Sequence, residues 1–488
     1  MAKLTGVIPS PKGCSMEERA CFTAPTVYCG DYRTAAEVFA EYAKKATNID
    51  YTLCDADDGE RGVRLVTDPM AAAGEYKLTA TAEGYVTLSA ADSEGIRYGL
   101  ATLLQMTELR PEGVLLTAGT VWDKPDSSYR GLSMDVARAS HPLPLLKEYI
   151  DICWLYKVRY FHLHLADDQG YTLPSRKFPK ATCAYGYTFE EIEELRAYAA
   201  ARDVQIVPEV DCPGHAKALI NAYPEIFGNL SLIRFHGDAI AAMQEIFREV
   251  CELFPESEYV HLGGDEGPLG WWMDHGECMA YGESLGYRVD DPAPGIPGNE
   301  YTMLRYLAHF ITKMAEAVRE CGKKPIVWEG FGKHVNDMIP KDITVMLWDG
   351  GYQTGPSLVA AGFNIINCSW IPNYLVVPTW DYSPRQCYDW DLYSFGSITD
   401  WSTYYGAITR LNPTAQIIGG QMCVWGDTVG TAYPTLEDGL ADEENKVMER
   451  IGYIMENAWN CEKIATFDRV DAAAHRADRL CRKILGKA

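Results

Sequence analysis

Two adjacent acids, Asp265 and Glu266, follow a short apolar run that ends in two glycines, YVHLGGDE (259–266). The alternation of this run predicts a buried strand, and Gly263 and Gly264 would let the backbone turn close to another group. Two like charges at the end of a buried strand repel each other, so one acid is expected to hold its proton to higher pH. A carboxyl that does so can act as a general acid, and this pair is our candidate catalytic centre.

The segments that would position this pair follow a repeating pattern from residue 129 onward. Short apolar runs, each followed by a helical stretch, occur eight times: GLSMDV (131–136), YFHLHLA (160–166), VQIVPEV (204–210), YVHLGGD (259–265), PIVWEG (325–330), ITVMLWD (343–349), FNIINCSW (363–370) and IIGGQMCVWGD (417–427). Eight alternations of strand and helix predict an α/β fold, a (β/α)8 TIM barrel, with catalysis at the carboxyl ends of the strands. Acidic residues and tryptophans gather at those ends in this chain.

Smaller units are expected on either side of the barrel. Residues 1–122 predict a small α+β domain, with helices over 32–45 and 96–106, a β-hairpin over 75–91 and a strand over 114–122. The barrel is then expected over 123–460. Residues 461–488 predict a C-terminal helical tail packed on the barrel, with its helix over 467–485.

Two connections inside the barrel, 267–299 and 371–414, are longer than the usual loop between strand and helix. Both contain several aromatic residues. Long aromatic loops over a barrel mouth predict a lid, or a wall on which a ligand stacks.

Composition and charge exclude several classes of function. The formal net charge of −24 argues against a nucleic-acid partner and fits a neutral or weakly charged small molecule. No apolar run is long enough to span a membrane, and the first twenty residues lack the apolar segment of a signal peptide. Fifteen scattered cysteines without a CxxC pair predict buried thiols in a reducing compartment, hence a cytoplasmic location.

No cofactor and no metal site are expected from the histidines of the predicted strands. His162, His164 and His261 have the spacing of strand residues, and no cysteine pair completes a ligand set. Paired carboxylates together with several tryptophans at one barrel mouth instead indicate a carbohydrate ligand, because aromatic faces stack on sugar rings while acids and arginine bind hydroxyls.

Four motifs resemble the family 20 glycoside hydrolases, the β-N-acetylhexosaminidases: YRGLSMDVARASHP (129–142), FHLHLADDQGY (161–171), VQIVPEVDCPGHAKAL (204–219) and YVHLGGDE (259–266). Residues 74–105 are similar to the small domain that precedes the barrel in that family, so the resemblance covers nearly the whole chain. It implies an exo-acting, retaining hydrolase of terminal β-linked GlcNAc or GalNAc. In that family the substrate's own 2-acetamido oxygen is the nucleophile, and an oxazolinium intermediate forms.

The resemblance also implies a role for each catalytic residue. Glu266 would be the general acid and afterwards the base, while Asp265 would hold the acetamide N–H and stabilise the oxazolinium. His215 would couple Glu266 to an aspartate, which the spacing makes Asp167 rather than Asp168.

Six substrate-binding residues follow from the same resemblance. They are Arg138 for the sugar hydroxyls, Trp328, Trp348 and Trp425 around the acetamide methyl, Tyr374 for the acetamide carbonyl, and Asp427 for the 4- and 6-hydroxyls. A further tryptophan of the family corresponds to Trp380 or Trp390, and the sequence does not choose between them.

The chain departs from the family pattern at two positions. Val376 stands where the family typically has an aspartate, and Asp427 stands where it usually has a glutamate. Asp427 is one methylene shorter, so its reach falls by roughly 1.5 Å. We expect this change to alter the far end of the sugar subsite, so that it admits galacto-configured sugars or a substituent on C6.

Two other functions stay open on the sequence. A barrel glycosidase could use two ordinary carboxylates, for example Glu209 paired with Glu266, or the chain could be a carbohydrate-binding protein that has lost catalysis. The expected partner is an oligosaccharide or glycoconjugate that ends in an N-acetylhexosamine. The natural glycan, its linkage and the oligomeric state, including a homo-oligomer, are not determined by the sequence.

Overall fold

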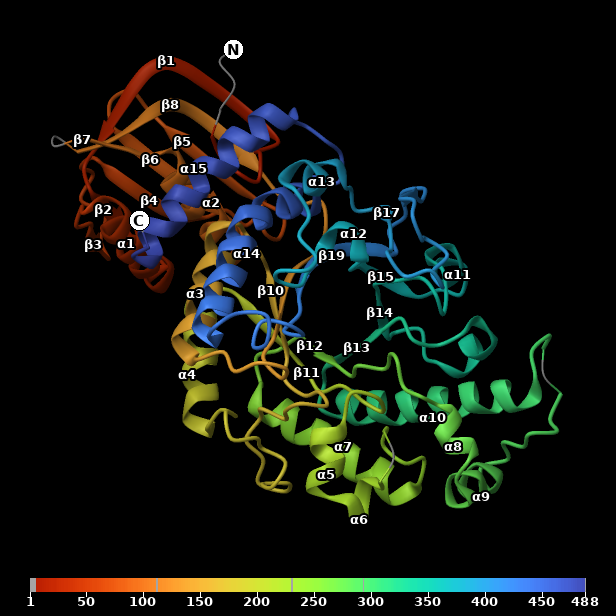
Figure 1. Ribbon diagram of the computed structural model, residues 1–488. Coiled ribbons are helices and arrows are strands. Elements are labelled where there is room, and N and C mark those ends of the chain that lie inside the picture. The colour runs from red at the N-terminus through yellow and green to blue at the C-terminus, as the bar shows by residue number, and fades with distance from the viewer. Residues whose placement is uncertain (1–5, 111–112, 230, 293, 488) are drawn as a thin grey trace.

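The computed structural model describes residues 6–110, 113–229, 231–292 and 294–487, which form two lobes (Figure 1). The smaller, N-terminal lobe holds one sheet with strand order β1-β8-β5-β6-β4-β2-β3, while β7 pairs with β8. Its elements are β1 (Gly13–Thr23), β2 (Thr26–Tyr28), α1 (Arg33–Thr47), β3 (Thr52–Cys54), β4 (Gly62–Thr67), β5 (Tyr76–Ala80), β6 (Tyr85–Ala90), α2 (Ser93–Met106), β7 (Glu108–Arg110) and β8 (Gly113–Asp123). The predicted helices, hairpin and strand are all present.

The helices of this lobe begin and pack for local reasons. Strands β5 and β6 form the predicted antiparallel hairpin, in which Tyr76 pairs with Ala90. Helix α2 begins just after it, because the side chain of Asp92 accepts a hydrogen bond from the backbone N–H of Gly95 at 2.7 Å. The buried residues of α2 pack against both strands of the hairpin.

The larger lobe is a closed parallel barrel, which confirms the predicted fold class. Its eight strands are β9 (Tyr129–Asp135), β10 (Tyr160–His164), β11 (Gln205–Glu209), β12 (Tyr259–His261), β13 (Lys324–Trp328), β14 (Thr344–Leu347), β15 (Asn364–Asn367) and β19 (Ile417–Val424). Each strand pairs in parallel with the next, and β19 closes the ring by pairing with both β15 and β9. Each of the eight predicted runs supplies one of these strands, because strands buried on both faces read as nearly continuous apolar runs.

The point of closure requires a residue without a side chain. A Cβ atom at Gly419 would lie 1.8 Å from the backbone oxygen of Tyr129, the residue with which it pairs on β9. Any other residue at this position would therefore push the first and last strands apart.

Helices and short elements connect the barrel strands. They are α3 (Leu143–Leu155), α4 (Phe189–Ala201), α5 (Lys217–Ala222), α6 (Pro224–Phe227), α7 (Gly237–Leu253), α8 (Gly270–Met273), α9 (Gly276–Ser284), α10 (Gly298–Glu320), the 3-10 helix η1 (Lys333–Met338), α11 (Gly355–Ala360) and α14 (Leu436–Trp459). The connection 267–299 contains α8 and α9. The connection 371–414 contains the end of α12 (Trp370–Asn373), then β16 (Tyr374–Leu375), α13 (Pro384–Asp389), β17 (Ser394–Phe395) and β18 (Thr409–Arg410).

The C-terminal helix α15 (Phe467–Leu485) joins the two lobes. The expectation was that it packs on the barrel, and it does contact α14 and α3 there. It also contacts α1 and α2 of the N-terminal lobe, and Figure 1 shows it lying against that lobe. The helix is strongly amphipathic, and its buried residues, among them Val470 and Ile484, form a face that both lobes cover.

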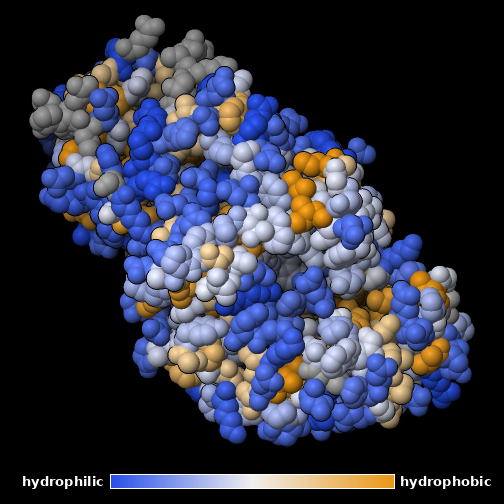
Figure 2. Space-filling view, viewed as in Figure 1, coloured by the Kyte–Doolittle hydropathy of each residue, from blue (hydrophilic) through white to orange (hydrophobic). Residues whose placement is uncertain are grey.

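The face seen in Figure 2 is mostly hydrophilic, and its hydrophobic residues form small separate patches. Among the described residues, no helix combines the length and the apolar character that crossing a bilayer requires. Ten of the fifteen cysteines are buried, as expected, while Cys321 is exposed.

Candidate active site

A pocket opens at the carboxyl ends of the barrel strands. It is lined by Arg138, His164, Asp211, His215, Asp265, Glu266, Trp348, Trp370, Tyr374, Val376, Trp380, Trp425 and Asp427. Its volume of about 160 Å³ is below the range typical of sites for drug-sized ligands and suits a single small unit. Eight of the ten predicted site residues line this pocket; the other two, Asp167 and Trp328, lie just below it.

The turn after β12 places the two adjacent acids at this mouth. A Cβ atom at Gly263 would lie 1.7 Å from Oδ1 of Asp211, so only glycine fits there, and its φ is 70°. The N–H of Gly264 donates to the same oxygen of Asp211 at 3.1 Å. Glu266 itself has a positive φ of 47°, a strained conformation for a residue with a side chain.

The two acids differ sharply in exposure. The side chain of Glu266 is 47% exposed, whereas Oδ1 of Asp265 is buried and has no hydrogen-bond partner among the described residues. Burial raises the pKa of Asp265 to about 6, and the charge of Glu266 adds to this shift. The raised pKa falls on Asp265, which the resemblance makes the partner of the acetamide and not the general acid, and burial rather than mutual repulsion is its larger cause.

The predicted relay of three residues is assembled. Nδ1 of His215 lies 3.3 Å from Oδ2 of Asp167, and Nε2 of His215 lies 3.4 Å from Oε2 of Glu266. Burial alone would lower the pKa of His215, but the hydrogen bonds to Asp167 and Glu266 raise it well above its ordinary value. Asp168 takes no part, because its carboxylate pairs with Lys217 at 2.5 Å on the outside of the barrel mouth.

Arg138 contacts the relay at Asp167. Its Nη1 contacts Asp135 at 2.7 Å, its Nη2 contacts Asp167 at 2.8 Å, and its guanidinium lies over the ring of Trp425, 5.3 Å from the centroid. Asp427, the shorter acid, lies 3.8 Å from Nε of Arg138 and is 49% exposed. Arg138 is thus held by two buried carboxylates, whereas Asp427 makes only a longer contact with it.

Tryptophans and a tyrosine form the wall of the pocket. Trp348 is fixed by a hydrogen bond from its Nε1 to the backbone oxygen of Glu329 at 2.7 Å, and its ring is nearly parallel to that of Tyr374. Trp425 follows β19 and lines the same pocket. Trp328 differs from the expectation: it is 1% exposed, does not line the pocket, and packs beneath Trp425 with the ring centroids 5.7 Å apart.

The long connection 371–414 contributes to the wall as predicted, and it distinguishes the two candidate tryptophans. Trp380 lines the pocket and packs edge-to-face on Trp370 at 5.2 Å. Trp390 is fully buried, and its Nε1 donates to the backbone oxygen of Ser394. Val376, at the position of the family's aspartate, also lines the pocket. The other long connection, 267–299, contributes no lining residue among those described.

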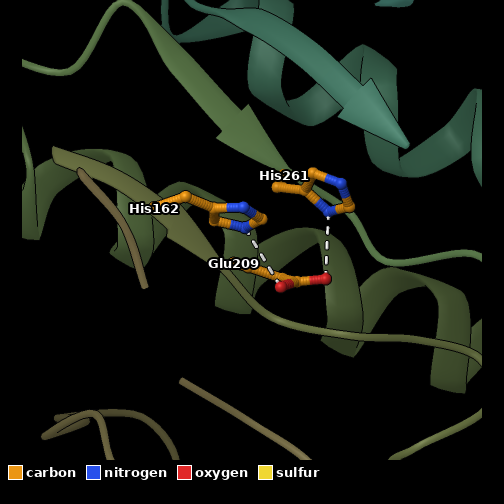
Figure 3. Close-up of side chains that lie close together, drawn as sticks. All are labelled: His162, Glu209 and His261. Atoms are coloured by element: carbon orange, nitrogen blue, oxygen red, sulfur yellow. Dashed lines mark ion pairs between the residues drawn. The ribbon is translucent and has the colours of Figure 1, made fainter. Parts of the chain in front are cut away.

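A cluster of polar side chains lies directly beneath the pocket. Glu209 is fully buried at its centre, and Figure 3 shows His162 and His261 pointing toward its carboxylate, each 3.1 Å away. Nδ1 of His164 approaches the same carboxylate at 2.7 Å, and Nε1 of Trp328 donates to it at 2.5 Å. Burial alone would raise the pKa of Glu209, but the neighbouring histidines, above all His164, hold it well below its ordinary value.

Three groups of described residues bring ligand-type atoms within 4.8 Å of one another: His162 with Glu209 and His261, His164 with Glu209 and Asp211, and Asp211 with His215 and Asp265. In the first two groups, the hydrogen bonds to Glu209 occupy the lone pairs that a cation would need. The prediction of no metal site stays a prediction.

Sequence reasoning missed several of the lining residues. His164 is part of a predicted strand, while Asp211 and Trp370 are among the acidic residues and tryptophans at the predicted strand ends, without an assigned role. For His164 a signal existed, because His162 and His164 are two residues apart and must face the same side of their strand. Asp211 is buried against Asp265, and burial together with that charge raises its pKa well above the ordinary value.

Comparisons with known proteins agree with this geometry. A family model described as "Glycosyl hydrolase family 20, catalytic domain" matches residues 128–460, and one described as "Glycosyl hydrolase family 20, domain 2" matches residues 4–124. A β-hexosaminidase of Vibrio furnissii is 30% identical over 72% of this chain and 61% of its own length. A β-hexosaminidase of Akkermansia muciniphila is 31% identical over 65% of this chain and 69% of its own.

Solved structures share the fold. The exo β-N-acetylglucosaminidase of Vibrio harveyi, solved with N-acetylglucosamine, superimposes with a TM-score of 0.78 at 21% identity, over 97% of this chain and 77% of that one. The β-hexosaminidase of Streptomyces plicatus, solved with its GlcNAc product, gives a TM-score of 0.74 at 20% identity, over 100% of this chain and 96% of that one. Because the catalytic-domain model matches most of the chain and includes every residue of the pocket, the chain belongs to glycosyl hydrolase family 20.

Proposed function

We propose that this protein is an exo-acting, retaining β-N-acetylhexosaminidase that removes terminal β-linked GlcNAc or GalNAc by substrate-assisted catalysis. The observation that carries the proposal is the buried, unpartnered Oδ1 of Asp265, next to the exposed Glu266 at the mouth of an aromatic pocket. A buried carboxylate oxygen without a donor is costly, and the N–H of a 2-acetamido group would supply that donor. The names of the relatives and the sugars bound in the solved structures support the same substrate class.

In the first step Glu266 donates a proton to the glycosidic oxygen, and the leaving group departs from C1. The carbonyl oxygen of the substrate's acetamide attacks C1 and closes the oxazolinium ring. Asp265 accepts the acetamide N–H, and its negative charge balances the positive charge that develops on the ring. Trp348, Tyr374 and Trp425 would enclose the acetamide and exclude water from it.

In the second step Glu266, now a carboxylate, removes a proton from water. That water attacks C1 from the side that the leaving group vacated, so the product keeps the β configuration. His215 holds the Glu266 carboxylate in place through both steps, and Asp167 fixes the ring of His215. The small volume of the pocket supports exo action, because it has room for one terminal sugar unit.

The alternative with two ordinary carboxylates finds little support. Its candidate partner, Glu209, is fully buried, does not line the pocket and already accepts hydrogen bonds from His164 and Trp328. A carboxylate in that position cannot reach a sugar carbon without unfolding its surroundings. The non-catalytic alternative rests on Val376 and Asp427, and neither residue belongs to the relay.

The proposal is tested with two nitrophenyl β-glycosides that differ only at C2, one with an acetamido group and one with a hydroxyl. Each is incubated with the wild-type protein and with Glu266→Gln. We expect hydrolysis of the acetamido substrate alone, and a loss of roughly 10³-fold in kcat/KM in the variant. Asp168→Asn is a suitable control, because Asp168 neighbours the relay without joining it, and its activity should match the wild type.

Each other outcome contradicts the proposal in a different way. Equal hydrolysis of both substrates would favour the two-carboxylate mechanism and leave Asp265 without its role. Binding of the acetamido sugar without hydrolysis, measured by calorimetry, would favour a carbohydrate-binding protein.

We also propose a cytoplasmic location for the protein. The support is the ten buried cysteines, which are free thiols and fit a reducing compartment. Fractionation of the producing cells tests the proposal, and recovery of the protein outside the cytoplasm would contradict it.

A further inference from the structure

Three histidine rings surround Glu209 at similar depth, and they differ in the other polar groups that they contact. His162, His164 and His261 are each at most 1% exposed, and each places one ring nitrogen within 3.1 Å of the Glu209 carboxylate (Figure 3 draws two of them). Because a carboxylate is an acceptor, the second contact of each ring decides whether the ring carries one proton or two.

His162 and His261 each meet a second group that donates. Nδ1 of His162 faces the amide nitrogen of Gln421 at 3.1 Å, and the amide oxygen of Gln421 is held by the hydroxyl of Tyr129. Nδ1 of His261, the same atom that lies 3.1 Å from Glu209, accepts the backbone N–H of Gly263 at 3.0 Å. A ring nitrogen that accepts carries no proton, so both rings are neutral. In agreement, burial lowers the pKa of His261 to about 4.

His164 meets a second acceptor instead. Its Nδ1 lies 2.7 Å from Oε2 of Glu209, and its Nε2 lies 2.9 Å from Oδ2 of Asp167. Because both partners are carboxylates, both ring nitrogens must donate, and the ring is an imidazolium. Burial alone would lower the pKa of His164, but Glu209 and Asp167 raise it well above the ordinary value.

The contacts of His164 extend the relay into the barrel interior. Glu209, His164, Asp167, His215 and Glu266 follow one another, with successive separations of 2.7, 2.9, 3.3 and 3.4 Å. We propose that His164 is a positioning residue for the acid of the proposed function: a permanently charged imidazolium that joins Glu209 to Asp167, keeps Asp167 aimed at His215, and sets the pH range in which the enzyme works. This inference rests on the proposed function and adds to it a residue that acts through Asp167.

The groups that face the two ends of this chain are mostly acidic. His164 faces Glu209, Asp167 and, further away, Asp135 and Asp211. Glu266 faces His215, Asp265 and Asp349. All of these groups except His215 are acidic, so the His164 charge is one of few cations near the reaction, together with Arg138 and His215. Its removal should disfavour the ionised form of every acid nearby.

The experiment compares His164→Gln with His162→Gln. Both replace a fully buried ring beside Glu209 by the same amide, but only the first removes a positive charge and a contact with Asp167. The quantity measured is kcat/KM for the 2-acetamido nitrophenyl glycoside as a function of pH, together with the melting temperature. In His164→Gln we expect both limbs of the pH profile to move to higher pH by roughly half a unit to one unit, and kcat to fall more than KM changes.

His162→Gln should lower the melting temperature by a similar amount and leave the pH profile in place, because it changes no charge. Equal pH profiles for the two variants, or a shift in His162→Gln alone, would overturn the inference. If His164→Gln does not fold, His164→Asn and the ¹⁵N NMR signals of the wild-type histidines provide the test. An imidazolium at His164 throughout the active pH range is expected, and a neutral ring would overturn the inference.

The two proposals fail in distinguishable ways. If the wild type does not discriminate between acetamido and hydroxyl substrates, the proposed function fails before any histidine variant is measured. If it does discriminate and Glu266→Gln is inactive, but His164→Gln keeps the wild-type pH profile, only the role of His164 is lost.

Discussion

The polar groups at the carboxyl end of the barrel form two layers that are held in different ways. In the lower layer, Glu209 is fully buried, and its contacts with three histidines and Trp328 measure 2.5 to 3.1 Å. In the upper layer, His215 meets Glu266 at 3.4 Å, Arg138 meets Asp427 at 3.8 Å, and both acids are about half exposed. A buried charge must be satisfied by the protein, whereas a catalytic acid must keep part of its surface for the substrate.

The backbone conformations of the two layers also differ. The residues of the lower layer lie on regular strands, where parallel pairing fixes their positions. His215 and Glu266 lie on the turns that follow, with φ values of 49° and 47°. Strained conformations of this kind persist only where the surroundings hold them, and the lower layer is the rigid support that these turns rest on.

The largest effect is expected for the buried acid of the upper layer. Asp265→Asn should lower kcat/KM for the 2-acetamido glycoside by roughly 10²-fold to 10³-fold, because a neutral amide cannot balance the positive charge of the proposed oxazolinium. The wild-type profile should fall as pH drops through about 6, where the raised pKa of Asp265 leaves that carboxyl protonated. The variant should lack this acid limb, and a variant with an unchanged limb would assign the limb to another group.

Glu209→Gln separates stability from activity. Neutralising Glu209 takes away one of the two carboxylates that hold the His164 imidazolium in the interior. We therefore expect a loss of about 3 kcal/mol or more in the free energy of unfolding, measured in urea. Glu266→Gln, at a half-exposed position, should change the same quantity by less than about 0.5 kcal/mol. Equal losses in the two variants would end the distinction between a supporting and a reacting layer.

The contacts of Glu209 also determine how the free energy of unfolding depends on pH. The pKa of Glu209 in the folded protein lies well below its ordinary value, so its stabilisation is present at neutral pH. That stabilisation is lost as pH falls toward the pKa of the folded state. The difference in unfolding free energy between the wild type and Glu209→Gln should therefore shrink in acid.

Trp380 and Trp390 are the two candidates for one tryptophan of the family, and the sequence does not distinguish them. The structure places Trp380 in the pocket wall and Trp390 in the core. Trp380→Ala should raise KM roughly tenfold by removing a wall of the pocket, with little change in melting temperature. Trp390→Ala should cost about 3 to 5 kcal/mol of stability, because it opens a cavity in the core. A strong effect of Trp390→Ala on KM in a folded protein would reverse the assignment.

The smallest effect is expected at Asp427. Restoring the family's glutamate with Asp427→Glu should raise the preference for gluco-configured over galacto-configured substrates by about threefold, the contribution of one weak hydrogen bond. The ratio of kcat/KM for the GlcNAc and GalNAc glycosides measures this directly. A wild type with a plain preference for unsubstituted GlcNAc, unchanged in the variant, would remove the reason to assign specificity to this position.

The sequence determined the fold, because the signal for each barrel strand is local. Eight apolar runs, each followed by a helix, became eight parallel strands, and the chemistry of the motif at 259–266 was readable because adjacent residues stay adjacent. The pairing of His215 with an aspartate was implied by the family resemblance, and the spacing from Arg138 favoured Asp167 over Asp168.

Tertiary structure decided what depends on depth and on distant contacts. Trp328 ends β13 and Trp348 directly follows β14, each after an aliphatic residue, yet Trp328 lies beneath the pocket and Trp348 lines it. In the sequence, His164 has only the features of an ordinary strand residue. The folded chain places Glu209 and Asp167 at its two ring nitrogens. A residue's type and spacing are properties of the chain, but its exposure and its charge state depend on neighbours that only folding brings together.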